Sequence, residues 1–137
     1  MNVTLAEVVN RHGVGVDAHH NLDALVPVFS GPQRQGDVLI IPDRAGDAAT
    51  IPVPQIGVPV VRGENGGNTH LLLAEGEVRY APPAAHSNDL CLGYLSVPPG
   101  AVAYLAHPQH GYMGIGPGGY ELRRQRQQAD VIRMVAD

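Results

Sequence analysis

Glycine and proline divide this chain into short segments, and this division constrains its fold more than any other feature. The 137 residues contain 17 glycines and 12 prolines, with no regular period. Both residue types interrupt helices and strand interiors, so the pattern disfavours long regular elements. Apolar residues still make up 44% of the chain, which is more than a disordered segment carries. The sequence therefore predicts a folded, loop-rich domain.

The apolar runs between these turn residues predict short strands. We expect them at residues 37–42, 69–74, 77–81, 90–97, 101–106, 112–115 and 120–127. Residues 51–61 carry three prolines, which suits an edge strand or an extended segment. Short strands at this spacing are typical of a β-sandwich or barrel. The fold class predicted is mainly β, as a compact β-sandwich or barrel with a short N-terminal helix.

Two pairs of these strands are predicted to form β-hairpins. The first has its turn at Glu75-Gly76, between residues 69–74 and 77–81. The second covers residues 107–126 and turns at the Gly/Pro run from Gly116 to Gly119. The second pairing would place the histidines and arginines of residues 107–126 in one hairpin.

The N-terminal segment is predicted to begin with a helix at residues 4–10. Thr4 is a suitable N-cap residue, and Glu7 stands three positions later, as in a capping box. We expect a single domain over residues 1–137, in which 1–34 form a less regular segment and 128–137 a short tail. At this length a domain buries roughly 68% of its unfolded surface.

Charge and cysteine content exclude several classes of protein. The net charge of −4 argues against nucleic-acid binding through bulk charge. Cys91 is the single cysteine and lies in an apolar run, so we expect a buried, unreactive thiol. Glu7 interrupts the position of a signal peptide's apolar core, and no run approaches the ~18 apolar residues of a membrane span. We therefore expect a cytoplasmic protein without membrane association.

Three histidines and one glutamate form a candidate metal site. His107 and His110 stand three positions apart at a strand end, and neutral imidazoles suit Zn, Fe, Ni or Cu. His70 opens a neighbouring strand and is the best candidate for a third ligand, with Glu75 as a fourth. The implied cofactor is a divalent transition metal. The alternative is that the histidines are ordinary exposed loop residues.

Arg123, Arg124 and Arg126 form a candidate site for an anion or a partner protein. Alternation along a strand would place Arg124 and Arg126 on one face and Arg123 on the other. A pair of guanidinium groups on one face can bind phosphate or carboxylate bidentately. The alternative is that the cluster solvates an edge strand and prevents aggregation.

The block from Gly63 to Glu75 resembles the first motif of the cupins. There a glycine precedes a pair of histidines and a glutamate follows; His70 and Glu75 stand at the second histidine and the glutamate. Pro98-Pro99-Gly100 is similar to the Pro-x-Gly of the second cupin motif. The resemblance implies a metal-dependent enzyme or a small-molecule binder. This chain has Asn68 and Ala103 where cupins have histidines.

A second resemblance covers residues 35–126. Q-G-D-V, G-E-x-x-G-x-x-H, H-P-x-H-G and P-G-x-Y-x-x-R-R-Q-R follow one another as in uncharacterised small proteins of bacterial and phage genomes. The resemblance implies a shared fold and a shared histidine region. Asn68 and Gln109 replace a histidine and a glutamate that members often carry.

Two functions follow from these observations. With one Phe and no Trp, the core is built from small side chains, which favours an interface with a second copy. The first hypothesis is a self-associating structural or accessory component of a bacterial or phage system, a homo-oligomer that also binds a partner protein. The alternative is a cupin-like metal-dependent enzyme or small-molecule binder. Because no complete catalytic motif is present, the sequence does not decide whether the protein is an enzyme.

Overall fold

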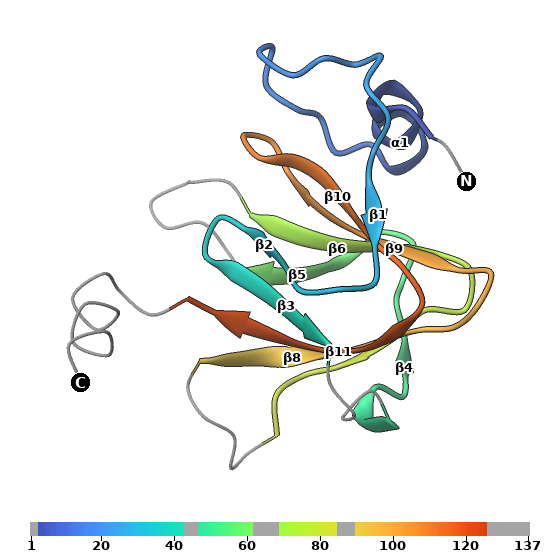
Figure 1. Cartoon of the computed structure of the whole chain (residues 1–137), viewed down its shortest axis with the longest axis vertical. Coiled ribbons are helices and arrows are strands. Elements are labelled where there is room, and N and C mark those ends of the chain that lie inside the picture. Colours follow the sequence, from blue (N-terminus) through green and yellow to red (C-terminus); the bar gives the residue numbers. More distant parts are fainter. Residues whose placement is uncertain (1–2, 43–46, 62–68, 85–89, 126–137) are drawn as a thin grey trace.

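The described part of the chain forms two β-sheets packed face to face and one helix near the N-terminus (Figure 1). The structure is a computed structural model, and it describes residues 3–42, 47–61, 69–84 and 90–125. The mainly β fold and the short N-terminal helix are confirmed. The described strands form a two-sheet sandwich and no closed barrel.

The two sheets share no strand. The five-stranded sheet has the order β1 (Val28–Phe29), β10 (Gly111–Ile115), β9 (Val102–His107), β6 (His70–Glu75) and β5 (Val58–Val61). The six-stranded sheet has the order β2 (Gln33–Gln35), β3 (Val38–Pro42), β11 (Gly118–Arg124), β8 (Cys91–Val97), β7 (Arg79–Ala81) and β4 (Ile51–Pro52). Neighbouring strands are antiparallel except β1 and β10, which are parallel.

The proline-rich segment lies at sheet edges, as predicted. Its residues form β4, at the edge of the six-stranded sheet, and β5, at the edge of the five-stranded sheet. An edge strand needs hydrogen bonds on one side only, so a proline without an N–H group is tolerated there.

Both predicted hairpins are wrong. β6 belongs to the five-stranded sheet and β7 to the six-stranded sheet, so the chain crosses between sheets at Gly76. β10 and β11 are separated in the same way. Turn residues mark where the chain reverses, but the packing of side chains from distant strands decides which sheet receives the next strand. β7 pairs with β8 through Tyr80 and Leu95, and β6 pairs with β9 through Leu72 and Leu105.

The main core fills the space between the sheets. Alternating residues of each strand point into it, as the burial pattern of β8 shows. Its buried members are Val38, Ile40, Leu72, Val78, Leu95, Val97, Ala101, Ala103, Leu105, Ile115, Tyr120 and Leu122. Cys91 is buried with a free thiol, as predicted.

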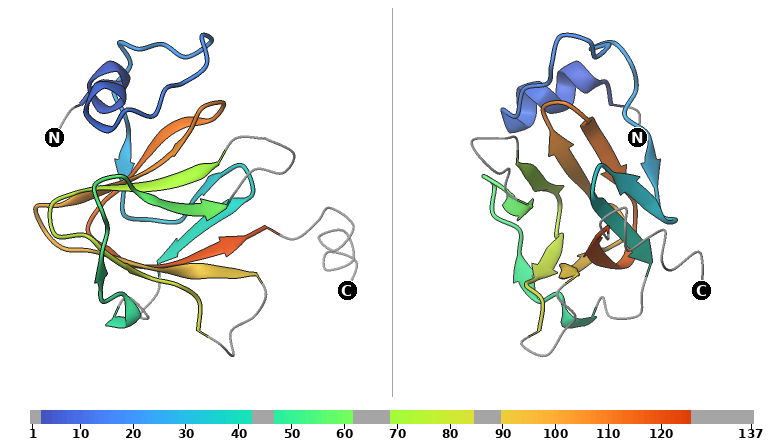
Figure 2. Two further views of the ribbon diagram at one scale, coloured as in Figure 1. Left: turned by 180° about the vertical axis from the view of Figure 1, so that it is seen from behind. Right: turned by 90° about the vertical axis from the view of Figure 1, so that its left-hand side faces the viewer.

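A second core lies on the outer face of the five-stranded sheet, where the N-terminal segment covers it. Helix α1 (Leu5–His12) has Thr4 as its N-cap, with both capping-box hydrogen bonds to Glu7. Figure 2 shows α1 and the chain after it on the side of this sheet away from the six-stranded sheet. The buried members of this second core are Val3, Leu5, Val8, Val26, Leu73, Val102, Tyr104, Ala106 and Tyr112.

Candidate functional site

The three predicted site histidines meet at one end of the sandwich. β6 and β9 are antiparallel with Leu71 opposite Ala106, so the start of β6 lies beside the end of β9. The ring centroids of His70 and His107 are 4.4 Å apart, and those of His107 and His110 are 4.6 Å apart. The His70 and His110 rings are nearly parallel, with centroids 5.8 Å apart. We call these three residues the histidine cluster.

The cluster continues the rows of side chains that fill the main core. His70 lies two residues from Leu72 on β6, and His107 two residues from Leu105 on β9, so each shares the inward face of its strand. Each is 6% exposed, whereas His110 is exposed in the turn after β9. At this end of the sandwich, imidazole rings therefore replace the aliphatic side chains that fill the space between the sheets elsewhere.

Gln35 connects the six-stranded sheet to the histidine cluster. It is buried at the end of β2, and its Nε2 donates to the carbonyl oxygens of Leu105 (2.9 Å) and Gly111 (3.1 Å). Because both donated bonds point at main-chain oxygens, the orientation of the amide is fixed, and Oε1 faces Nδ1 of His70 at 2.9 Å. The hydrogen bonds of one side chain thus link strands of both sheets.

This contact determines the protonation state of His70. Oε1 of Gln35 only accepts, so Nδ1 of His70 donates and carries the ring proton. Burial first, and then the nearby charges of His107 and His110, lower the pKa of His70 to about 4, against an opposing effect of Asp37. The ring is therefore neutral at pH 7, with an unprotonated Nε2 atom.

His107 has the opposite arrangement. Its Nδ1 accepts hydrogen bonds from the backbone N–H groups of Gln109 (3.1 Å) and His110 (3.2 Å), which stabilise the turn after β9. When the ring is neutral, its proton is therefore on Nε2. In the histidine cluster, Nε2 of His70 can therefore accept a hydrogen bond, whereas Nε2 of the neighbouring neutral His107 ring carries a proton.

Gly36 allows the turn between β2 and β3 to approach the cluster. Its φ of +56° is in the left-handed region, and a Cβ atom there would lie 2.9 Å from Nε2 of His110 and 3.3 Å from Cε1 of His70. Asp37 follows in the same turn and accepts a backbone hydrogen bond from Gln125 at 2.7 Å. A larger residue in place of Gly36 would displace an imidazole.

Glu75, the fourth predicted metal ligand, lies away from the histidine cluster. It ends β6, five residues after His70, which corresponds to about 16 Å along a strand. Its carboxylate contacts Nε2 of His12 at 2.9 Å and Nη1 of Arg11 at 3.2 Å. It therefore fixes α1 to the sheet.

The donor set does not fit a metal centre of three histidines. A ligating histidine usually donates its second ring N–H to a carbonyl or carboxylate oxygen; His70 does so, whereas His107 accepts at that position. Within residues 3–42, 47–61, 69–84 and 90–125, no group of three or more His, Cys, Asp or Glu side chains is arranged to hold a metal ion.

The three arginines are not brought together as a described group. Arg123 donates from Nη1 to Glu121 at 3.2 Å, Arg124 is exposed at the end of β11, and Arg126 lies outside the described residues. The binding of an anion or a partner there stays a prediction, as does the tail at 128–137, which is also outside the described residues.

No role was predicted for Gln35 from the sequence. Gln35 ends β2, and Gly36 and Asp37 form the turn that follows it. The sign that the sequence offered for Gln35 was a polar residue standing directly before a glycine and an apolar run. Nothing local indicated that its amide is buried against strands 70 residues later in the chain.

Residues 34–125 match the family described as a domain of unknown function (DUF8820), and the chain belongs to it. Gln35 and the histidine cluster lie inside the matched range, whereas α1 and β1 precede it. The family assignment agrees with the predicted membership of an uncharacterised family. No curated protein matches the chain, and no solved structure matches it. In the described part of the chain, no helix has the length and apolar character needed to cross a membrane.

Proposed function

We propose that this DUF8820 domain binds a small polar molecule at the histidine cluster, where Nε2 of His70 accepts a hydrogen bond or a proton from it. The observation that carries the proposal is the fixed contact between Gln35 and His70, which holds the ring in one tautomer. A base prepared in this way accepts a proton or a hydrogen bond without first reorienting.

Three further features support this function. The pKa of about 4 keeps His70 unprotonated at neutral pH, which a hydrogen-bond acceptor requires. His110 is exposed, so the cluster is reachable from solvent. Gly36 lets the turn between β2 and β3 pack directly against the His70 and His110 rings, which holds them in place. The ligand class that fits is a small molecule with an O–H or N–H group, such as an alcohol or a weak acid.

The test is a titration of the ¹⁵N-labelled protein with acetamide, inorganic phosphate and glycerol, followed through the histidine side-chain resonances. We expect at least one of the three to shift the Nε2 resonance of His70 saturably. His70→Gln should abolish this response. The matched control is His19→Gln, because His19 is exposed and its ring contacts that of His20 rather than the cluster. Failure of all three probes to shift His70 would contradict the proposal.

A zinc titration in the same spectra examines the alternative metal-dependent function. Stoichiometric binding that shifts all three rings would mean that His107 gives up its Nδ1 contacts in the turn. That result would replace the proposed polar ligand with a metal ion.

A second candidate function is self-association through the N-terminal segment. Four of the six large apolar side chains that are exposed among the described residues lie within residues 22–29: Leu22, Leu25, Val28 and Phe29. Val28 and Phe29 form β1 at a sheet edge, and an exposed apolar edge is a site for pairing with another chain.

Light scattering after size-exclusion chromatography tests this second function. We expect a dimer or larger assembly at micromolar concentration, and Phe29→Asp should convert it to a monomer. Ile56→Asp is the control, because Ile56 is 85% exposed in the turn between β4 and β5 and lies outside residues 22–29. A monomeric wild-type protein would exclude it.

A further inference from the structure

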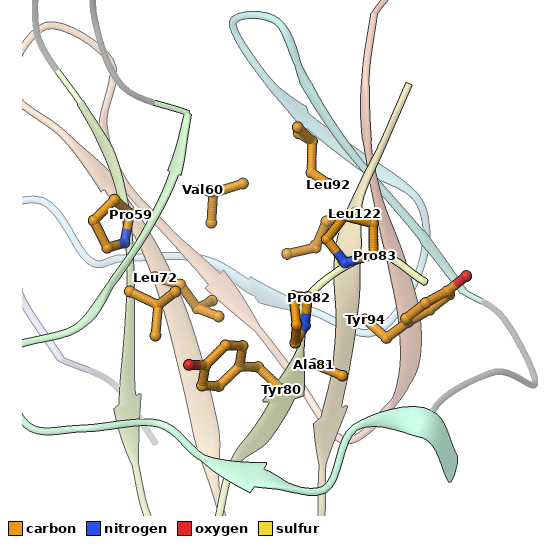
Figure 3. Close-up of a pocket in the computed structure, with 12 residues that line it drawn as sticks. Pro59, Val60, Leu72, Tyr80, Ala81, Pro82, Pro83, Leu92, Tyr94 and Leu122 are labelled. Carbon is orange, nitrogen blue, oxygen red and sulfur yellow. The ribbon is translucent and has the colours of Figure 1, made fainter. Parts of the chain in front are cut away.

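A cavity of about 200 Å³ lies between the two sheets, away from the histidine cluster. β5 of the five-stranded sheet forms one wall, and β7 and β8 of the six-stranded sheet form the other. Figure 3 shows Val60 and Leu72 on one side and Tyr80 and Leu92 on the other. It is partly open to solvent, and Pro59, Pro82 and Pro83 of its lining are exposed.

The lining of this cavity is apolar. Valine, leucine, alanine, proline and tyrosine side chains supply it, and no Asp, Glu, Arg or His occurs among the described residues that form it. Few polar side-chain atoms line the cavity, so water molecules inside have fewer hydrogen-bond partners than in bulk water, and an apolar guest can displace them. The cavity therefore suits an apolar guest and excludes ions.

The walls resist collapse into the cavity. Pro59, Pro82 and Pro83 have fixed φ angles, so their segments lose little freedom when they are held in place. Gly93 on β8 has φ of +144°, and a Cβ atom there would lie 2.5 Å from the carbonyl oxygen of Ala81. Because the backbones of β7 and β8 are in contact at this point, position 93 has no room for a larger residue, and no side chain from there can fill the cavity.

We propose that this cavity binds a neutral molecule with a single aromatic ring or a branched aliphatic group of that size. A dry cavity of about 150 Å³ lined by aliphatic and aromatic side chains holds benzene. The larger cavity here leaves room for one or two small substituents on the ring. The site is separate from the proposed polar site, because none of its lining residues belongs to the histidine cluster.

Fluorobenzene is the probe for this proposal, added to the full chain and followed by its ¹⁹F resonance. We expect saturable binding with a dissociation constant on the order of 1 mM, as for a ligand of seven heavy atoms. Val60→Phe places a ring in the cavity and should weaken binding by about tenfold or more. Leu39→Phe adds a ring on the opposite face of β3 from the core and should leave binding unchanged.

Methyl spectra of the wild-type protein locate the bound probe without any variant. Fluorobenzene should shift the methyl resonances of Leu72, Leu92 and Leu122, which line the cavity. These shifts decide the question if Val60→Phe does not fold. Absence of saturable binding, or shifts confined to other methyl groups, would overturn the proposal. The polar probes and His70→Gln report on the other site, so each proposal can fail alone.

Discussion

Replacing Gln35 by methionine tests the main structural argument, because methionine keeps the length of the side chain and removes its polar atoms. Three hydrogen bonds are lost: those to the Leu105 and Gly111 carbonyls and that from His70. A buried polar group without a partner costs about 1–3 kcal/mol. The lower end applies here, because a main-chain oxygen has a second lone pair that a ladder bond can use. We expect Gln35→Met to lower the free energy of unfolding by about 3 kcal/mol.

Urea unfolding at pH 7 measures this effect, and a thermal scan should show a melting temperature lower by about 10 °C for a domain of this size. Gln55→Met is the control: Gln55 is exposed in a turn, so its replacement should change stability by no more than about 0.5 kcal/mol. Gln35→Met should cost less in the His70→Gln background, because one of the three bonds is then already changed. A Gln35→Met protein within about 1 kcal/mol of the wild type would refute the argument that Gln35 holds the two sheets and the cluster together.

Three further changes have outcomes that the structure determines. The pKa of His70 falls from 6.5 to about 4 on folding, so the unfolded chain binds more protons between these pH values. About 3 kcal/mol of stability that is present above pH 6.5 should therefore be lost as the pH falls to 4. Urea unfolding across this range should show the loss in the wild type and a flatter profile in His70→Gln. Gly93→Ala should destabilise by about 2 kcal/mol or more, since its Cβ would meet a carbonyl oxygen at 2.5 Å, whereas Gly100→Ala, with φ of +83° and open space around it, should show only the smaller cost of the backbone angle. Leu122→Ala, in the main core at 3% exposure, should lower stability by roughly 2–4 kcal/mol, and a loss below about 1 kcal/mol in chemical denaturation would contradict its assignment to that core.

The features that the sequence predicted are those that depend on neighbouring residues. Thr4 and Glu7 form their capping box within one helical turn, and the prolines of residues 51–61 exclude central strands wherever the segment lies. The sheet that each strand joins depends on distant partners. The chain does leave β6 at Glu75-Gly76, but its next strand lies in the other sheet, so the predicted hairpin was wrong.

The same distinction between contacts of neighbouring residues and contacts of distant residues applies to the candidate site. His107 and His110 are close because they flank one turn, and His70 reaches them because β6 and β9 are neighbours. Glu75 was grouped with His70 through the resemblance to the first cupin motif, but a strand carries it to the opposite end of the sheet. Gln35 could not be predicted, because its contacts are with residues 35 to 76 positions away.

The position of the N-terminal segment bears on where a DUF8820 domain can be cut. The family match begins at residue 34, yet the outer face of the five-stranded sheet is covered by residues before that point. A fragment of residues 34–125 would present Leu73, Tyr104 and Tyr112 to water and would lose β1 from the sheet edge. A relative without such a segment must therefore have polar residues on that face or cover it with another chain.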